Sequence, residues 1–219
     1  MIRCPSPNFD ARPIGGPIDM LVLHYTGMES AKAALDRLCD PAAKVSAHYL
    51  IDEDGSITAM VDESARAWHA GASCWRGNRD VNARSIGIEL VNPGHDNGYR
   101  AFPEAQMAAL ERLAAEILAR HPIPPRNVVA HSDVAPIRKI DPGELFDWRR
   151  LALRGIGLWP ESATGRTGDV TDALAAYGYD VTDAKAAVSA FQRRFRPACF
   201  DGVADEETAA LAAGLLRQL

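Results

Sequence analysis

Residues 18–25, Ile-Asp-Met-Leu-Val-Leu-His-Tyr, decide the fold of this 219-residue chain. The run is short and almost entirely apolar, and it lies between Gly15-Gly16 and Gly27. Such a run is typical of a strand that is buried on both faces of a sheet. We therefore expect a central strand here, with His24 close to its end.

The first 160 residues contain further predicted strands and helices. Short apolar segments that predict strands are residues 47–51, 56–60, 85–91 and 128–130. The first two of these flank a turn in which Gly55 supplies the positive φ, which predicts a β-hairpin. Helices are expected from the cap Ser30 to Cys39, from Pro103 to about Arg120, and after the cap Asp147. This pattern predicts an α/β domain with a mixed central sheet flanked by helices.

The C-terminal part of the chain has a different composition. Residues 160–168, Pro-Glu-Ser-Ala-Thr-Gly-Arg-Thr-Gly, have the composition of a linker. Three helical stretches follow, at residues 169–177, 183–195 and 205–219. A three-helix domain of about 50 residues is marginal alone and gains stability by docking. We expect a first domain at 1–160, a linker at 161–168 and a three-helix domain at 169–219.

Composition and charge limit the partners of the protein. Apolar residues make up 47%, charged residues 24%, and the formal net charge is -5. Without a block of Lys and Arg, we expect no nucleic-acid partner. No apolar run approaches the roughly 20 residues that a membrane span needs, so none is expected. No feature indicates an obligate protein partner.

The N-terminus and the cysteines bear on the cellular compartment. The first residues, Met-Ile-Arg-Cys-Pro-Ser-Pro, lack the apolar segment of a signal peptide, which predicts a cytoplasmic protein if Met1 is the native start. If Met1 is not the native start, a periplasmic location is the alternative. Cys4, Cys39, Cys74 and Cys199 form no paired motif, and we expect reduced, mostly buried thiols.

Three polar residues follow predicted strands or lie near their ends. His24 and His131 come directly after apolar runs, and Asp141 lies ten residues beyond His131. Two imidazoles and one carboxylate can form a hydrolytic zinc site that leaves one position open for water. On spacing alone, the alternative is that both histidines are ordinary buried or surface groups. The zinc-peptidase motif His-Glu-x-x-His is absent.

A series of motifs resembles the type 2 family of N-acetylmuramoyl-L-alanine amidases. They are SPNFDARP (6–13), IDMLVLHYTGM (18–28), VSAHYLIDEDG (45–55), RAWHAG (66–71), SIGIELVN (85–92), VVAHSDVAP (128–136) and RKIDPG (138–143). The superfamily includes peptidoglycan recognition proteins and phage amidases. The sequence is most similar to bacterial muropeptide amidases that also accept 1,6-anhydro sugars.

The resemblance implies an activity and a set of site residues. A member of this family cuts the amide bond between N-acetylmuramic acid and L-alanine, so muropeptides are the implied partners. His24, His131 and Asp141 would bind Zn²⁺, which lowers the pKa of bound water to about 7. Glu89 would take a proton from the water and pass it to the departing amine. Lys139 would stabilise the developing oxyanion.

Other residues are predicted to line the substrate cleft. They are His48, Trp68, His69, Asn78 and Arg79, with Trp75 as a further candidate. Indole faces suit sugars, and Arg forks suit the carboxylates of stem peptides. For His48 a structural role is an equal alternative.

Several alternatives remain open at the level of the sequence. The chain could be a non-catalytic peptidoglycan receptor, although the predicted ligands and Glu89 are all present. A zinc peptidase that cuts elsewhere in the stem peptide is another reading. Without an export signal, muropeptide recycling is the expected role, and wall remodelling is the alternative for an exported form.

The C-terminal helices carry a second resemblance. Residues 187–195 and 201–211 resemble a three-helix peptidoglycan-binding domain. The segment between Tyr179 and Asp183 is short for that family, which favours a role as a structural brace or as a wall of the substrate cleft.

Overall fold

The computed structural model describes residues 1–160 and 168–219. The linker predicted at 161–168 therefore lies, apart from Gly168, outside the described residues. No helix of the described part is long and apolar enough to cross a membrane.

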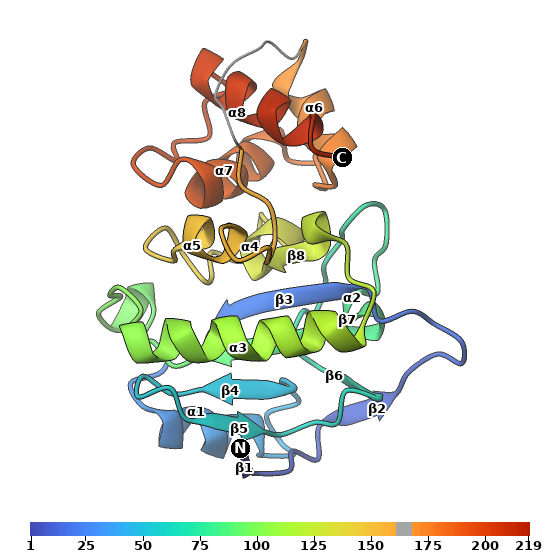
Figure 1. The fold of residues 1–219 in the computed structure, drawn as a ribbon, viewed down its shortest axis with the longest axis vertical. Coiled ribbons are helices and arrows are strands. Elements are labelled where there is room, and N and C mark those ends of the chain that lie inside the picture. Colours follow the sequence, from blue (N-terminus) through green and yellow to red (C-terminus); the bar gives the residue numbers. More distant parts are fainter. Residues whose placement is uncertain (161–167) are drawn as a thin grey trace.

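A mixed sheet forms the centre of the molecule, as the sequence predicted, and it has six strands (Figure 1). Its order is β1 (Ile2–Arg3), β5 (Ile57–Ala59), β4 (Tyr49–Ile51), β7 (Ser85–Leu90), β3 (Met20–Tyr25) and β8 (Val128–Ala130). Strands β4, β7, β3 and β8 run parallel to one another, and the β4–β5 hairpin supplies the antiparallel pair. A second, two-stranded sheet pairs β2 (Phe9–Ala11) with β6 (Ala65–Ala67). Strands β1, β2 and β6 were not predicted from the sequence, because they are two or three residues long and have few buried side chains.

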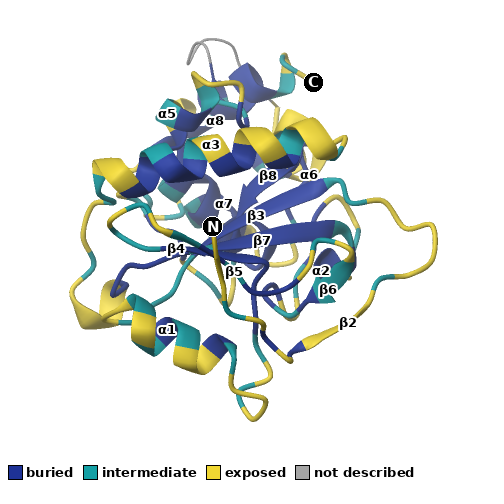
Figure 2. Cartoon of the chain, turned by 60° about the horizontal axis from the view of Figure 1, so that its bottom comes forward, coloured by how far each residue is buried: buried dark blue, intermediate teal, exposed yellow. Residues whose placement is uncertain are grey.

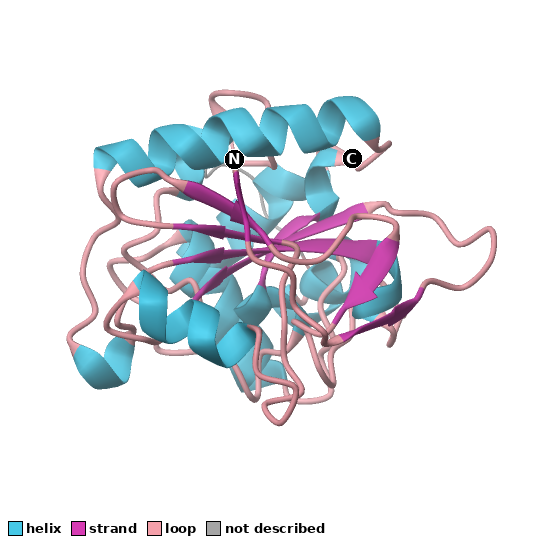
Figure 3. Cartoon of the chain, turned by 90° about the horizontal axis from the view of Figure 1, so that it is seen from below, coloured by secondary structure: helices cyan, strands magenta, loops and turns pink. Residues whose placement is uncertain are grey.

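Helices cover both faces of the central sheet. Seen end-on, α3 (Glu104–Arg120) lies on one face of the strands and α1 (Ala31–Leu38) on the other (Figure 3). Figure 2 shows that α3 is buried on the side that faces the strands and exposed on the other. The short elements are α2 (Val81–Arg84), α4 (His131–Val134), α5 (Trp148–Ala152) and the 3-10 turns η1 (His95–Asn97) and η2 (Pro125–Asn127).

Side chains of β3 alternate between two apolar clusters. Leu21 and Leu23 pack in the cluster that includes α3. Met20 and Val22 pack in another cluster, which also contains residues of the C-terminal helices. Because successive side chains of a strand point to opposite faces, His24 lies on the same face as Met20 and Val22.

The C-terminal helices α6 (Val170–Tyr177), α7 (Ala184–Phe195) and α8 (Glu206–Leu216) match the three predicted helical stretches. They lie together beyond α4, α5 and β8 in Figure 1. Leu174, Phe191 and Leu215 share one apolar cluster with β3, so these helices are docked on the sheet domain. We call residues 168–219 the C-terminal unit.

Two expectations about individual residues were wrong. Trp75 does not line a cleft: it is 1% exposed, lies in the shared apolar cluster, and donates its indole N–H to Asn127 Oδ1 at 3.2 Å. The thiols are not mostly buried either, because Cys74 is buried but Cys4 and Cys39 are half-buried and Cys199 is exposed.

Candidate metal and active site

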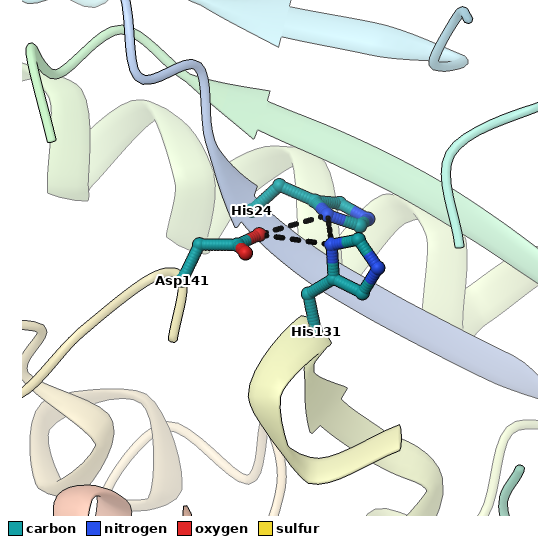
Figure 4. Close-up of side chains that lie close together, drawn as sticks. All are labelled: His24, His131 and Asp141. Atoms are coloured by element: carbon teal, nitrogen blue, oxygen red, sulfur yellow. Dashed lines mark hydrogen bonds and ion pairs between the residues drawn. The ribbon is translucent and has the colours of Figure 1, made fainter. Parts of the chain in front are cut away.

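His24, His131 and Asp141 meet at one end of the central strands (Figure 4). His24 comes from β3, His131 begins α4 directly after β8, and Asp141 lies in the turn that follows. Their Nδ1, Nδ1 and Oδ2 atoms form a nearly equilateral triangle: 2.9 Å between the two nitrogens and 3.1 Å from each nitrogen to the oxygen. All three side chains are buried. The sequence thus predicted a cluster that the fold assembles.

The hydrogen bonds around His131 define which ring nitrogen carries its proton. His131 Nε2 lies 3.1 Å from the carbonyl oxygen of Ala70. A carbonyl only accepts, so Nε2 must carry the hydrogen. In a neutral imidazole, Nδ1 then presents a lone pair to the centre of the triangle.

The same conclusion holds for His24 through a longer chain of contacts. The Ser85 hydroxyl donates to the Val81 carbonyl at 2.6 Å, so its oxygen accepts from His69 Nε2 at 3.1 Å. His69 Nδ1 is therefore an acceptor, and His24 Nε2 donates to it at 3.1 Å. His24 Nδ1 consequently also presents a lone pair to the triangle.

Three electron-pair donors thus converge with no proton between them. Burial, followed by the proximity of His131, lowers the pKa of His24 to about 4, so this imidazole is neutral at pH 7. Burial acts to raise the pKa of Asp141, but the neighbouring His131 and His24 hold it well below its usual range, so Asp141 is a carboxylate. The lone pairs of two imidazole nitrogens and a carboxylate oxygen in this arrangement would repel one another without a cation. The donor set therefore fits a divalent metal ion, and His69 and Ala70 orient the ligands.

Glu89 faces this cluster from the adjacent strand. In the β3–β7 register, Glu89 pairs with His24, so both side chains lie on the same face of the sheet. Its Oε2 is buried and has no hydrogen-bond partner among the described residues. Burial, with a contribution from the charge of Asp141, raises the pKa of Glu89 well above its ordinary value. A carboxyl in this state is suited to taking up and releasing a proton.

A pocket of about 490 Å³ gives access to the cluster. Its lining includes the three clustered residues together with Glu89 and Lys139. Tyr25, Trp68 and Arg138 form other parts of the wall. The pocket therefore has room for a substrate next to the metal-binding atoms.

One face of β7 carries Glu89 and also the residues that position the His69 ring. Ser85, Gly87 and Glu89 alternate along the strand and point the same way. The His69 ring lies directly over Gly87, where a Cβ would come within 2.5 Å of the ring. Glycine at position 87 thus makes room for the ring that orients His24.

The predicted substrate-binding residues separate into two groups. Trp68 and His69 line the pocket, although the ring nitrogens of His69 are engaged by His24 and Ser85. His48 lies outside the pocket lining: it is fully buried, accepts the Gly87 N–H at Nδ1, and contacts Arg12 and the Ala65 carbonyl at Nε2. These contacts match the structural alternative for His48.

Asn78 and Arg79 also lie outside the lining of the metal-site pocket. Asn78 pairs with Trp75 in a tight turn and caps the backbone of Asp80. Arg79 contacts Asp180 of the C-terminal unit at 3.6 Å, in a neighbouring pocket. Neither side chain is placed to contact a substrate bound beside His24, His131 and Asp141 in this structure.

Arg12 has a role that sequence reasoning did not assign. Its guanidinium donates to four backbone carbonyls, those of Glu63, Asn82, Ala83 and Ser85, and contacts His48. It therefore holds the start of β7 beside the N-terminal segment. The only available signal was its position in the motif SPNFDARP.

Comparison with known proteins agrees with this geometry. Residues 14–144 match the family described as N-acetylmuramoyl-L-alanine amidase (Amidase_2). The N-acetylmuramoyl-L-alanine amidase AmiD of Escherichia coli K12 is 41% identical over 92% of this chain and 83% of its own length. The 1,6-anhydro-N-acetylmuramyl-L-alanine amidase AmpD of Haemophilus influenzae is 37% identical over 66% of this chain and 86% of its own length. The chain belongs to this amidase family.

A solved structure extends the similarity to the C-terminal unit. The complex of E. coli AmiD with anhydro-N-acetylmuramic acid-L-Ala-D-gamma-Glu-L-Lys superposes with a TM-score of 0.84 at 40% identity, covering 95% of this chain and 91% of that one. The protein described here is thus an N-acetylmuramoyl-L-alanine amidase, and its fold and buried ligand cluster agree with that activity.

Proposed function

We propose that the protein is a zinc amidase that releases the stem peptide from 1,6-anhydro-N-acetylmuramic acid. The observation that carries the proposal is the convergence of three lone-pair donors opposite Glu89, whose Oε2 has no hydrogen-bond partner among the described residues. Two imidazoles and one carboxylate, with one side open to a pocket, are a donor set typical of catalytic zinc. His24, His131 and Asp141 would hold the ion.

The chain's own residues supply the remaining chemistry. Zinc bound there would act as a Lewis acid on the amide carbonyl and would acidify water. Glu89 is positioned to accept the proton of the attacking water, because its Oε2 has no hydrogen-bond partner among the described residues and its raised pKa favours proton uptake. It then returns that proton to the departing L-alanine nitrogen. Lys139 would donate to the carbonyl oxygen as negative charge develops there.

The anhydro-sugar preference is supported by proteins to which this chain is similar. The AmiD structure contains an anhydro-muramoyl tripeptide. AmpDH3 of Pseudomonas aeruginosa, in complex with anhydromuramic pentapeptide, superposes with a TM-score of 0.83 at 35% identity, covering 92% of each chain. A role in muropeptide recycling would follow from such a substrate, and the cytoplasmic location expected from the sequence stays a prediction.

Mass spectrometry of the products from a defined anhydro-muropeptide tests this function. We expect an intact anhydro-sugar and a free peptide that begins at L-alanine, lost on chelation and restored by zinc. His131→Ala should bind no zinc and yield no product. Cleavage at another bond would favour the peptidase reading. A zinc-loaded protein that binds muropeptides without cutting them would favour the receptor reading, and either result would overturn the proposal.

A further inference from the structure

Arg194 of α7 reaches into the sheet domain beside α4, the helix that begins at the metal-ligand candidate His131. Its Nη1 lies 2.6 Å from Asp133 Oδ2, and the two side chains are 1% and 0% exposed. Its Nη2 donates to the Val128 carbonyl at 3.0 Å. The guanidinium also lies over the ring of Trp148, 4.0 Å from its centre. Arg194 therefore contacts the strand and the helix that flank His131.

Asp133 couples this contact to the metal ligand. It lies two residues after His131 in the short helix α4, and its Oδ2 accepts the Ala130 N–H at 2.8 Å. Its Oδ1 accepts from the hydroxyl of Tyr179, also in the C-terminal unit, at 2.7 Å. The turn that presents His131 is thus held by a carboxylate whose partners outside that turn come from the C-terminal unit.

Arg193, the residue before Arg194, contacts the segment that carries Asp141. Arg193 Nε lies 3.9 Å from Glu144 Oε2, three residues after Asp141. Glu144 also contacts His95 at 3.1 Å. This interaction is longer and more exposed than that of Arg194, so we expect it to contribute less.

We propose that the C-terminal unit is a positioning element of the metal site, acting on His131 through the Arg194–Asp133 pair. The inference rests on the proposed metal-binding function of the cluster. A buried ion pair contributes little net stability, but its geometry is demanding because either charge alone is strongly disfavoured. The pair can therefore form only when α7 is docked in one arrangement, and that arrangement fixes the turn that presents His131.

The shared apolar cluster supports this reading. An appended binding module would keep its own core and a small, polar contact with its neighbour. Here Val22, Val129 and Val134 of the sheet domain lie in the same cluster as Phe191 of α7. The helix that carries Arg194 is consequently fixed by packing as well as by charge.

Zinc affinity of the full-length protein, measured by competition with a chromophoric chelator, tests the proposal. Arg194→Met should weaken zinc binding about tenfold, at the lower end of the 10–100-fold range for residues that orient metal ligands. The matched control is Arg196→Met. Arg196 belongs to the same segment and is similarly buried, but its ion-pair partners Asp205 and Glu207 lie within the C-terminal unit. Its removal should lower the melting temperature of the metal-free protein and leave zinc affinity within twofold of the wild type.

Tyr179→Phe provides a milder variant if Arg194→Met does not fold. It removes one donor to Asp133 and retains the ion pair, so zinc affinity should fall about two- to threefold, short of the 10–100-fold range for direct ligand-orienting residues. The absorption spectrum of the cobalt-substituted protein should shift for Arg194→Met and Tyr179→Phe but not for Arg196→Met, because it reports ligand geometry.

The outcomes separate this inference from the function on which it rests. A wild-type protein that binds no zinc would overturn the proposed metal function. Wild-type zinc binding with unchanged affinity in both Arg194→Met and Tyr179→Phe would overturn only the positioning role. Equal loss of affinity in Arg194→Met and Arg196→Met would show general destabilisation and would also overturn it.

Discussion

Two glutamates in pockets of similar volume have opposite environments. Glu63 lines a pocket of about 510 Å³ near the N-terminus, and Glu89 lines the metal-site pocket of about 490 Å³. Glu63 accepts from Tyr49 and Arg120 at 2.7 Å and contacts His121 at 2.7 Å. Burial acts to raise its pKa, but these partners, Arg120 foremost, lower the pKa to about 2. Glu89 has an unpartnered oxygen and a raised pKa.

The contrast shows why pocket size alone does not locate the active site. The Glu63 carboxylate binds Tyr49, Arg120 and His121, and these contacts hold β4, α3 and the segment after β5 together. Oε2 of Glu89 has no such partner among residues 1–160 and 168–219, so this carboxyl remains available for proton transfer. A glutamate oxygen without a hydrogen-bond partner in the described part of the chain, beside a metal-binding cluster, is the distinguishing feature.

The largest expected effect is on turnover by Glu89→Gln. The amide keeps the shape of the side chain but cannot take up a proton, so kcat should fall about 10²–10⁴-fold. Zinc content should remain that of the wild type, because Glu89 is not among the clustered ligand atoms. Steady-state kinetics together with metal analysis would check both. If Glu63→Gln lowered kcat as much as Glu89→Gln, the distinction between the two carboxylates would fail.

A smaller effect is expected from His69→Phe. The ring volume is retained, but the acceptor for His24 Nε2 is lost, so His24 is no longer held with its Nδ1 lone pair toward the metal. Zinc affinity should fall about 10–100-fold. His121→Phe is the control at the other glutamate, and chelator competition should show no change for it. Unaltered zinc binding in His69→Phe would argue against the orienting role.

The smallest effect is expected from Glu63→Gln, and it concerns stability. A carboxyl whose pKa is lower in the folded than in the unfolded protein stabilises the fold above the unfolded pKa, near 4.5, and loses this as pH falls toward 2. Removing the charge should cost about 1–2 kcal/mol of unfolding free energy at pH 7, allowing for solvent screening.

Urea unfolding at several pH values would check this expectation. The difference between Glu63→Gln and wild type should shrink as pH drops from 5 to about 2, over the window set by the two pKa values. A difference that stays constant across that range would mean that the effect comes from packing and not from charge.

The sequence predicted those parts of the molecule that depend on local pattern. The buried run at 18–25 became β3, and the caps Ser30 and Asp147 begin α1 and α5. The short edge strands β1 and β2 carry no periodic pattern, because they are held by pairing with distant strands. Local patterning therefore identified buried strands such as β8 and missed the short, exposed ones.

For the site, the sequence pattern identified the ligands but not what holds them. His24, His131 and Asp141 follow from strand ends and from family motifs. The orienting role of His69 depends on its ring lying over Gly87, which no spacing along the chain reveals. The Arg194–Asp133 pair joins residues 61 positions apart in different parts of the chain. Such contacts are set by docking and are visible only in three dimensions.

The shared apolar cluster also has a consequence for how the protein folds during its synthesis on the ribosome. Synthesis proceeds from the N-terminus, so β3, β7 and β8 emerge before α6, α7 and α8. Until the last helices appear, Val22 and Val129 lack part of their apolar surroundings, and Asp133 lacks its cation. The nascent sheet domain would thus expose apolar surface and an unpaired Asp133 until α6, α7 and α8 are synthesised and docked.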